Sequence, residues 1–208
     1  MKFLFVLVTC LSHLTDVNGQ NTKHSITNVI VNYSIAKIEN DDKSKLPTEY
    51  LFFGKNDMSR AEISINGTKK IIISDNLSRA GFLLSAKGKS KSALKLNPLN
   101  IKSKSANYSV ELTRESKSIA GFVCYKAFIS KQTFNGAVTK EVWFNSEIKC
   151  RNGYGITILG INGLLMEFET QDLDHKTYKL TAQKVDVSTL LGDSLFRVPK
   201  GYKIVERE

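Results

Sequence analysis

Few side chains in this sequence have the types and spacing that catalysis requires. A nucleophilic mechanism needs a histidine oriented beside a serine or cysteine, with an acid behind it. Beyond the first 19 residues, the histidines are His24 and His175. Neither belongs to a G-x-S-x-G turn or an H-E-x-x-H helix, the local patterns that would place such groups. We therefore expect a protein that is not an enzyme and that uses no cofactor.

Three potential metal ligands lie close together in the last fifth of the sequence. Asp172, Asp174 and His175 follow one another closely. A structural metal site takes about four ligands, supported by further hydrogen bonds. The flanking Gln171 and Lys176 are typical of a polar turn, so we predict a turn and no bound metal.

Cys124 and Cys150 form an even pair, which in an exported protein allows a disulfide. Cys124 lies within a predicted strand, and Cys150 comes just after the next one. If these strands form a hairpin with its turn near residues 132–136, Cys124 faces a position near 145. A disulfide needs Cα atoms within about 7 Å, so the chain would have to curl back after its strand. The alternatives are this disulfide and a buried free thiol at Cys124.

The first 19 residues have the layout of a cleavable export signal. Lys2 gives a positive start, an apolar run covers residues 3–8, and residues 17–19 are small or neutral. The run is shorter than the roughly 20 residues that span a bilayer. A buried strand and a lipid-attachment motif ending at Cys10 are alternatives, although Thr9 is unusual before a lipidated cysteine. We expect a signal over residues 1–19 and one domain over residues 20–208.

The positive charge is unevenly distributed. The chain has 30 basic and 20 acidic residues, a net charge of +10, and residues 76–110 contain basic side chains but no acid. Such a block attracts anionic lipid headgroups, but it is also typical of a solvated loop. Nucleic acid is not expected, because no aromatic residues alternate with these lysines for base stacking. The candidate contacts with an anionic membrane surface are Lys87, Lys89, Lys91 and Lys95.

Alternating apolar and polar residues predict β-strands through most of the chain. The predicted strands before residue 115 cover residues 25–37, 50–53, 59–65, 69–74, 81–86, 93–96 and 108–112. Asn66-Gly67 is a strong hairpin signal. The regular turn spacing predicts one continuous antiparallel meander, with local helix expected only within residues 85–105 and 187–196.

The strands between residues 119 and 202 carry more apolar side chains than one face of a thin meander needs. These side chains either fill a core or line the cavity of a curved half-barrel, and both arrangements require the same alternation. The two alternatives stay open at this point. The candidate cavity-lining residues are Phe122, Phe128, Trp143, Leu164, Met166 and Phe168.

The same region resembles known families of exported proteins. Residues 118–130 (SIAGFVCYKAFIS) and 137–148 (AVTKEVWFNSEI) are similar to a hairpin of the secreted GLPGLI-motif family of Bacteroidetes-type bacteria. Residues 159–169 (LGINGLLMEFE) stand where that family has its namesake motif, with Asn162 in place of proline. Residues 179–203 and 52–76 resemble a sister family of uncharacterised exported proteins.

These families are related to the LolA/LppX-like superfamily, so the resemblance implies a mainly β fold. That fold is an incomplete antiparallel β-barrel whose apolar cavity is partly covered by short helices or loops. Better-known members carry lipids or lipoproteins through the periplasm. The resemblance therefore implies export to the periplasm or the outer-membrane-associated envelope of a Gram-negative bacterium. No catalytic residue and no specific partner carries over.

Two functions follow as expectations. The first is a binding or carrier protein of the cell envelope for a lipid, lipoprotein or other apolar ligand. The second is a non-catalytic structural or interaction module of the envelope with a filled core. A continuous apolar cavity of more than about 300 Å³ would favour the first function.

Overall fold

The computed structural model describes residues 25–38, 46–65, 67–75, 77, 80–87, 90–96, 108–134, 136–152, 160–171 and 177–206. The expected signal over residues 1–19, Lys89 and the acidic group at residues 172–175 lie outside these ranges. Within them, the chain forms strands almost throughout, which confirms the expectation of a mainly β protein.

Twelve strands and one short 3-10 helix make up the described chain. The first six strands are β1 (Asn28–Lys37), β2 (Glu49–Lys55), β3 (Met58–Ile65), β4 (Thr68–Asp75), β5 (Ala80–Lys87) and β6 (Ser90–Leu96). The next five are β7 (Tyr108–Ile119), β8 (Phe122–Thr133), β9 (Gly136–Asn145), β10 (Leu164–Gln171) and β11 (Thr177–Asp186). The 3-10 helix η2 (Asp193–Phe196) and strand β12 (Lys203–Val205) follow.

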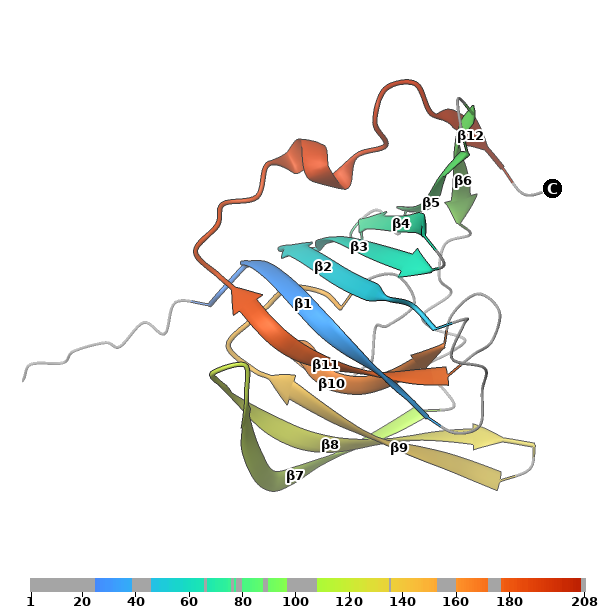
Figure 1. Cartoon of the computed structure of the whole chain (residues 1–208). Coiled ribbons are helices and arrows are strands. Elements are labelled where there is room, and N and C mark those ends of the chain that lie inside the picture. Colours follow the sequence, from blue (N-terminus) through green and yellow to red (C-terminus); the bar gives the residue numbers. More distant parts are fainter. Residues whose placement is uncertain are drawn as a thin grey trace, which may run out of the picture.

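All twelve strands belong to one open sheet, in the order β12-β6-β5-β4-β3-β2-β1-β11-β10-β9-β8-β7 (Figure 1). The sheet consists of two meanders, β1–β6 and β7–β11, joined where β11 pairs with β1. The prediction of one continuous meander was wrong at this point, because β7 does not continue from β6. The outer edge of β6 is instead occupied by β12, which pairs with it in parallel.

Local pairings follow the sequence closely. Ile65 pairs with Thr68, so β3 and β4 form a hairpin where the sequence predicts one. Tyr125 pairs with Phe144 in the β8–β9 hairpin, so the expected register of that hairpin is confirmed. The strands of both hairpins are joined by short turns, and a short turn fixes the register of a hairpin.

The helix predictions were only partly right. Residues 85–87 and 90–96 are strand, although their lysine and serine content suggested local helix. β5 pairs with β4 and β6 pairs with β5, and packing across these pairs outweighs the weak intrinsic strand preference of their residues. Within residues 187–196, only the four residues of η2 are helical.

The sheet has apolar side chains on both faces. We call the face that bears Val31, Phe52 and Ala61 the inner face, and the opposite face the outer face. The main hydrophobic core includes these three residues and extends over β8–β11. A second, smaller core lies on the outer face, where Ile73 and Leu84 are covered by the C-terminal segment.

The C-terminal segment runs along the outer face of the sheet (Figure 1). Polar and apolar contacts hold it there. Leu191 and Phe196 are buried in the second core. Lys55 Nζ donates to the carbonyl oxygen of Leu191 at 2.8 Å and to Asp193 Oδ1 at 2.6 Å. Arg60 Nη1 donates to the carbonyl oxygen of Leu195 at 3.1 Å. The outer face of β3–β5 is therefore closed by the chain itself.

Candidate functional site

Most of the candidate cavity-lining residues lie in the main core. Trp143, Leu164, Met166 and Phe168 are all buried there, whereas Phe122 and Phe128 are partly exposed. Met166 is 0% and Leu164 is 1% exposed. A side chain without accessible surface borders no space that a water molecule could enter. These two residues are therefore tightly packed, and their contact with a ligand stays a prediction.

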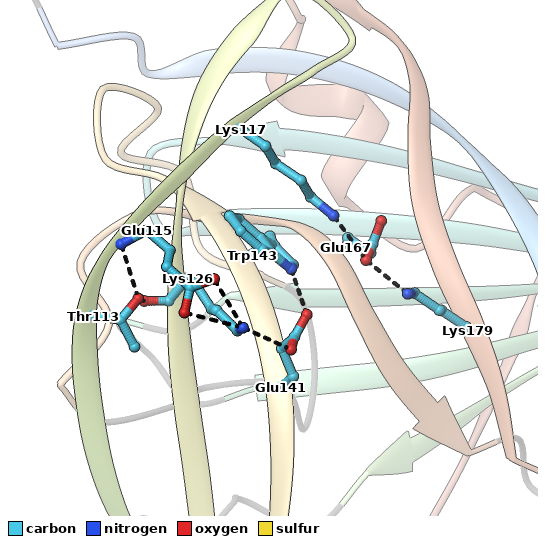
Figure 2. Close-up of polar contacts among 8 residues, drawn as sticks. All are labelled: Thr113, Glu115, Lys117, Lys126, Glu141, Trp143, Glu167 and Lys179. Atoms are coloured by element: carbon cyan, nitrogen blue, oxygen red, sulfur yellow. Dashed lines mark hydrogen bonds and ion pairs between the residues drawn. The ribbon is translucent and has the colours of Figure 1, made fainter.

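Trp143 also contacts a cluster of charged residues contributed by β7–β11 (Figure 2). Lys117 Nζ lies 4.2 Å from the centre of the indole ring, and Lys126 Nζ lies 5.7 Å from it. The indole Nε1 donates to Glu141 Oε1 at 2.7 Å. Cations over a tryptophan face are attracted by the negative potential of the ring. The sequence could not distinguish this charged environment from a cavity wall. Alternating apolar and polar residues indicate which side chains are buried, but not which residues surround them.

Glu167 connects the charged cluster to β11. Its Oε1 accepts hydrogen bonds from Lys117 at 3.1 Å and from Lys179 at 2.7 Å. Burial alone would raise the pKa of this carboxyl, but the hydrogen bonds from the two lysines outweigh it, so its pKa lies below its ordinary value. Glu167 is therefore held ionised, as a charge shared between two cations.

Lys126 lies on β8 and pairs with Trp143, which pairs on its other side with Glu167 of β10. Its Nζ lies 3.1 Å from Glu115 Oε2 and 3.2 Å from Glu141 Oε2. The hydrogen bonds to Glu115 and Glu141 raise the pKa of Lys126. The hydrogen bond from Trp143, helped by Lys126, lowers the pKa of Glu141 against the effect of burial. The raised pKa of Lys126 and the lowered pKa of Glu141 both favour the charged forms of these two groups.

A different set of apolar residues remains partly exposed on the inner face. One cross-strand row runs through the six strands β1–β6, with each residue paired to the next in the register. It consists of Val31, Phe52, Ala61, Ile72, Leu83 and Leu94. The first three are buried, and the last three are partly exposed. We call Ile72, Leu83 and Leu94 the inner apolar row.

The inner apolar row was not selected from the sequence, although each of its members lies in or beside a predicted strand. Leu83 and Leu94 belong to neither hydrophobic core of the described residues. The side chains on the opposite side of the same strands, such as Leu84 and Ala93, are fully covered. β5 and β6 are thus apolar on both faces, which is typical of strands that are covered on both faces.

A lysine accompanies the inner apolar row. Lys70 is two residues before Ile72 in β4 and therefore points to the same face. Its pairing with Ile63 of β3 agrees with this placement, because Ile63 also belongs to the inner face. Among the described residues, no carboxylate lies within ion-pair distance of Lys70. The neighbouring Lys69, in contrast, is paired with Glu62.

The lysines selected from the sequence for membrane contact lie elsewhere. Lys95 pairs with Glu206 at 2.7 Å, and Lys91 Nζ lies 5.9 Å from the ring centre of Tyr202. Both contacts fasten the C-terminal segment to β6. Lys87 is the last residue of β5. The role of these lysines at an anionic surface stays a prediction.

Both cysteines of the described chain are free and buried, so the disulfide alternative was wrong. Their surroundings differ, because Cys124 lies near Lys117 and Glu167, whereas Cys150 packs against Gly54. Burial raises the pKa of each thiol to about 11. Thiolates are the reactive form of cysteine, so neither residue is a candidate nucleophile.

Within the described ranges, no three histidine, cysteine or acidic residues gather as a metal site. No helix in that part of the chain is long and apolar enough to cross a membrane. Comparison with known proteins finds no matching family model and no matching curated protein.

Proposed function

We propose that this protein is an exported, non-catalytic binding or carrier protein of the cell envelope for a lipid, lipoprotein or other apolar ligand. The observation that carries the proposal is the inner apolar row. Its three residues are paired across β4, β5 and β6 and stay partly exposed, while the outer face of the same strands is covered. An apolar chain lying along this row would cover the inner face of these strands.

The size and chemistry of the row suit an acyl chain. Neighbouring strands lie about 4.8 Å apart, so the step from Ala61 to Leu94 across three strand spacings covers roughly 14 Å. Burying an acyl chain there gains about 0.8 kcal/mol for each CH₂ removed from water. Several methylenes would suffice for useful affinity without any hydrogen bond to the ligand.

Lys70 offers a contact for a polar headgroup of the proposed ligand. Its ammonium is the cation beside Ile72 on the inner face, and no described acid neutralises it. An anionic headgroup placed there would form a charge-assisted hydrogen bond. We therefore favour an anionic lipid, with its chain on Leu83 and Leu94 and its headgroup at Lys70.

The LolA-like assignment is part of the same proposal. An open, mostly antiparallel sheet of twelve strands accords with an incomplete barrel. The export signal and the family resemblance add support from the sequence. The proposal differs from the first expectation in one respect, because it moves the apolar ligand from β8–β10 to β4–β6.

A second candidate is an interaction module of the envelope with a filled core. The complete burial of Met166 and Leu180 favours it, since the β8–β11 end of the core contains no space beside these residues. In that case the inner apolar row would serve to hold another protein and would not bind a free lipid.

Binding of a fluorescent fatty acid separates the two candidates. We would titrate the protein with 11-(dansylamino)undecanoic acid, whose emission rises when it leaves water. Leu83→Asp and Leu94→Asp should abolish the rise, and Lys70→Gln should weaken binding severalfold. Leu190→Asp, at a residue that is 87% exposed on the C-terminal segment, is the matched control. Circular dichroism would verify that each variant folds. No saturable binding by the parent protein would leave the interaction module as the better account.

A further inference from the structure

A polar cavity is built by residues far in the sequence from the inner apolar row, and it has no part in the proposed function. Its volume is about 250 Å³. Four segments line it: Thr27 just before β1, the β2–β3 turn at Asn56, the chain after β9 from Lys149 to Asn152, and the turn before β10 at Asn162. The last segment belongs to the motif that resembles the GLPGLI family, so the motif builds one wall of this cavity.

The walls of the cavity are fixed by backbone hydrogen bonds. The amide of Asn56 donates to the carbonyl oxygen of Thr27 at 2.8 Å, and the amide of Lys149 donates to that of Ile26 at 2.7 Å. The amide of Arg151 donates to the carbonyl oxygen of Asn56 at 3.3 Å. The β2–β3 turn, the start of β1 and the chain after β9 therefore hold one another in place.

Asn152 fixes the wall before β10. Its Nδ2 donates to the carbonyl oxygen of Gly163 at 3.0 Å, and its Oδ1 accepts from the amide of Leu165 at 2.5 Å. The side chain thus acts as a strand partner for the start of β10. A cavity whose walls are already ordered loses little conformational entropy when it binds a ligand.

The lining of the cavity carries more positive than negative charge. Lys149 and Arg151 face a single acid, Asp57, and Arg151 Nε lies 3.1 Å from Asp57 Oδ1. That contact uses Nε, and within the described residues the two terminal guanidinium nitrogens have no acceptor. Lys149 has no ion-pair partner in the described part of the chain. A guanidinium fork and an ammonium are the groups that recognise oxyanions.

We propose that this cavity binds a small ligand through an oxyanion, either a carboxylate or a phosphate group. Asn56, Asn162 and Thr27 line the same space, and their side chains include two amides and a hydroxyl that could add neutral donors. Its volume lies below the roughly 300 Å³ at which drug-sized pockets begin, so it fits a small molecule or a terminal group. The polar lining distinguishes it from the site proposed for an acyl chain.

The test is a titration of the ¹⁵N-labelled protein with sodium phosphate and, separately, with sodium acetate, at constant ionic strength. The amides of Lys149 and Asn152 should shift in a saturable manner with at least one of the two anions. The anion that saturates first identifies the preferred oxyanion. Lys149→Gln and Arg151→Gln should each weaken binding by about tenfold, as expected for loss of a charge-assisted hydrogen bond.

Lys200→Gln is the control for net charge, because Lys200 is exposed on the C-terminal segment and does not line the cavity. Asn162→Asp is a further variant that places a negative charge at an exposed part of the wall, and it should weaken binding more than the loss of one cation does. Linear, unsaturated shifts, or equal affinity in Lys149→Gln and the parent, would overturn the proposal. Binding of the dansyl fatty acid should be unchanged in these variants, so the two proposals fail independently.

Discussion

The ammonium group of Lys117 lies 4.2 Å from the centre of the Trp143 ring. The same Nζ reaches Glu167 Oε1 at 3.1 Å, so one lysine joins a buried aromatic ring to a buried carboxylate. A cation over a partly desolvated tryptophan contributes about 1–2 kcal/mol. The contact therefore links β7, the edge strand of the sheet, to β9 and β10.

Replacing Lys117 with methionine should lower the free energy of unfolding by about 1–2 kcal/mol, because both contacts are lost while the aliphatic stem is kept. Urea unfolding followed by the emission of Trp143, the single tryptophan of the chain, measures the change. Lys179→Met is the matched control, since it removes the other lysine of Glu167 but leaves the cation over the ring. Equal destabilisation by the two variants would contradict a contribution from the cation–ring contact.

Glu167 should make stability depend on pH in the acid range. Its pKa is lower in the folded protein than in the unfolded chain, where it is about 4.3. Its contribution is therefore complete above that unfolded value and is lost as the pH falls through the lower, folded value. The difference in unfolding free energy between the parent and Glu167→Gln should shrink as the pH is lowered from 7 to 3. Glu111→Gln, at an exposed position of β7, should show a difference near zero throughout.

Gly163 should not tolerate a side chain. A Cβ atom at this position would lie 2.1 Å from the carbonyl oxygen of Asn145, which is backbone and cannot swing away. Asn145 is itself held, because its Oδ1 accepts from the amides of Glu147 and Ile148. Gly163→Ala should therefore destabilise the protein by about 3 kcal/mol, as an overpacked core position does. Thermal unfolding would measure this.

Gly192→Ala is the control for that substitution. Gly192 has extended backbone angles, and a Cβ there would meet its nearest atom, Ser194 Oγ, at 3.7 Å. We expect a change within about 0.5 kcal/mol. A neutral effect of Gly163→Ala would show that the close approach of β10 to Asn145 is wrong.

Removal of the Phe196 side chain should uncover the outer face. Phe196 is 7% exposed and packs in the core that covers Ile73 and Leu84. Phe196→Ala should cost about 3–5 kcal/mol, whereas Leu190→Ala, at an exposed site nearby, should cost almost nothing. Chemical unfolding gives both values. A small effect of Phe196→Ala would mean that the C-terminal segment does not cover the sheet in solution.

Both thiols should resist modification in the folded protein. Cys124 and Cys150 are buried, and their pKa values of about 11 keep them protonated at neutral pH. Ellman's reagent should react with them only after unfolding in guanidinium without a reductant. If neither thiol reacted even in the unfolded protein, a disulfide would be present and the structure would be wrong there.

The sequence predicted local pairings better than distant ones. The turn between Ile65 and Thr68 and the register of Tyr125 with Phe144 depend on short loops, whose residues are visible in the sequence. The pairing of β1 with β11 joins residues such as Ile30 and Asp186, and alternation contains no information about such a distant partner. The parallel addition of β12 to β6 was missed for the same reason.

The candidate site was harder to predict than the fold. Met166 is buried in the main core, and Trp143 lies beneath Lys117 and Lys126. Alternation predicts that such residues are buried but not whether they meet a cavity, a core or a lysine. Leu83 and Leu84 are adjacent apolar residues on opposite faces, and nothing in the sequence tells which face the C-terminal segment covers. The inner apolar row emerges only when the registers of β1–β6 are known.

The most direct test of the central claim is native mass spectrometry of the protein purified from its host cells in mild detergent. We predict a bound species with the mass of an anionic lipid, present in the parent and in Leu190→Asp. The same species should be absent from Leu83→Asp and reduced in Lys70→Gln. A parent protein that carries no added mass, or an adduct unaffected by Leu83→Asp, would contradict the proposal that the inner apolar row holds a lipid.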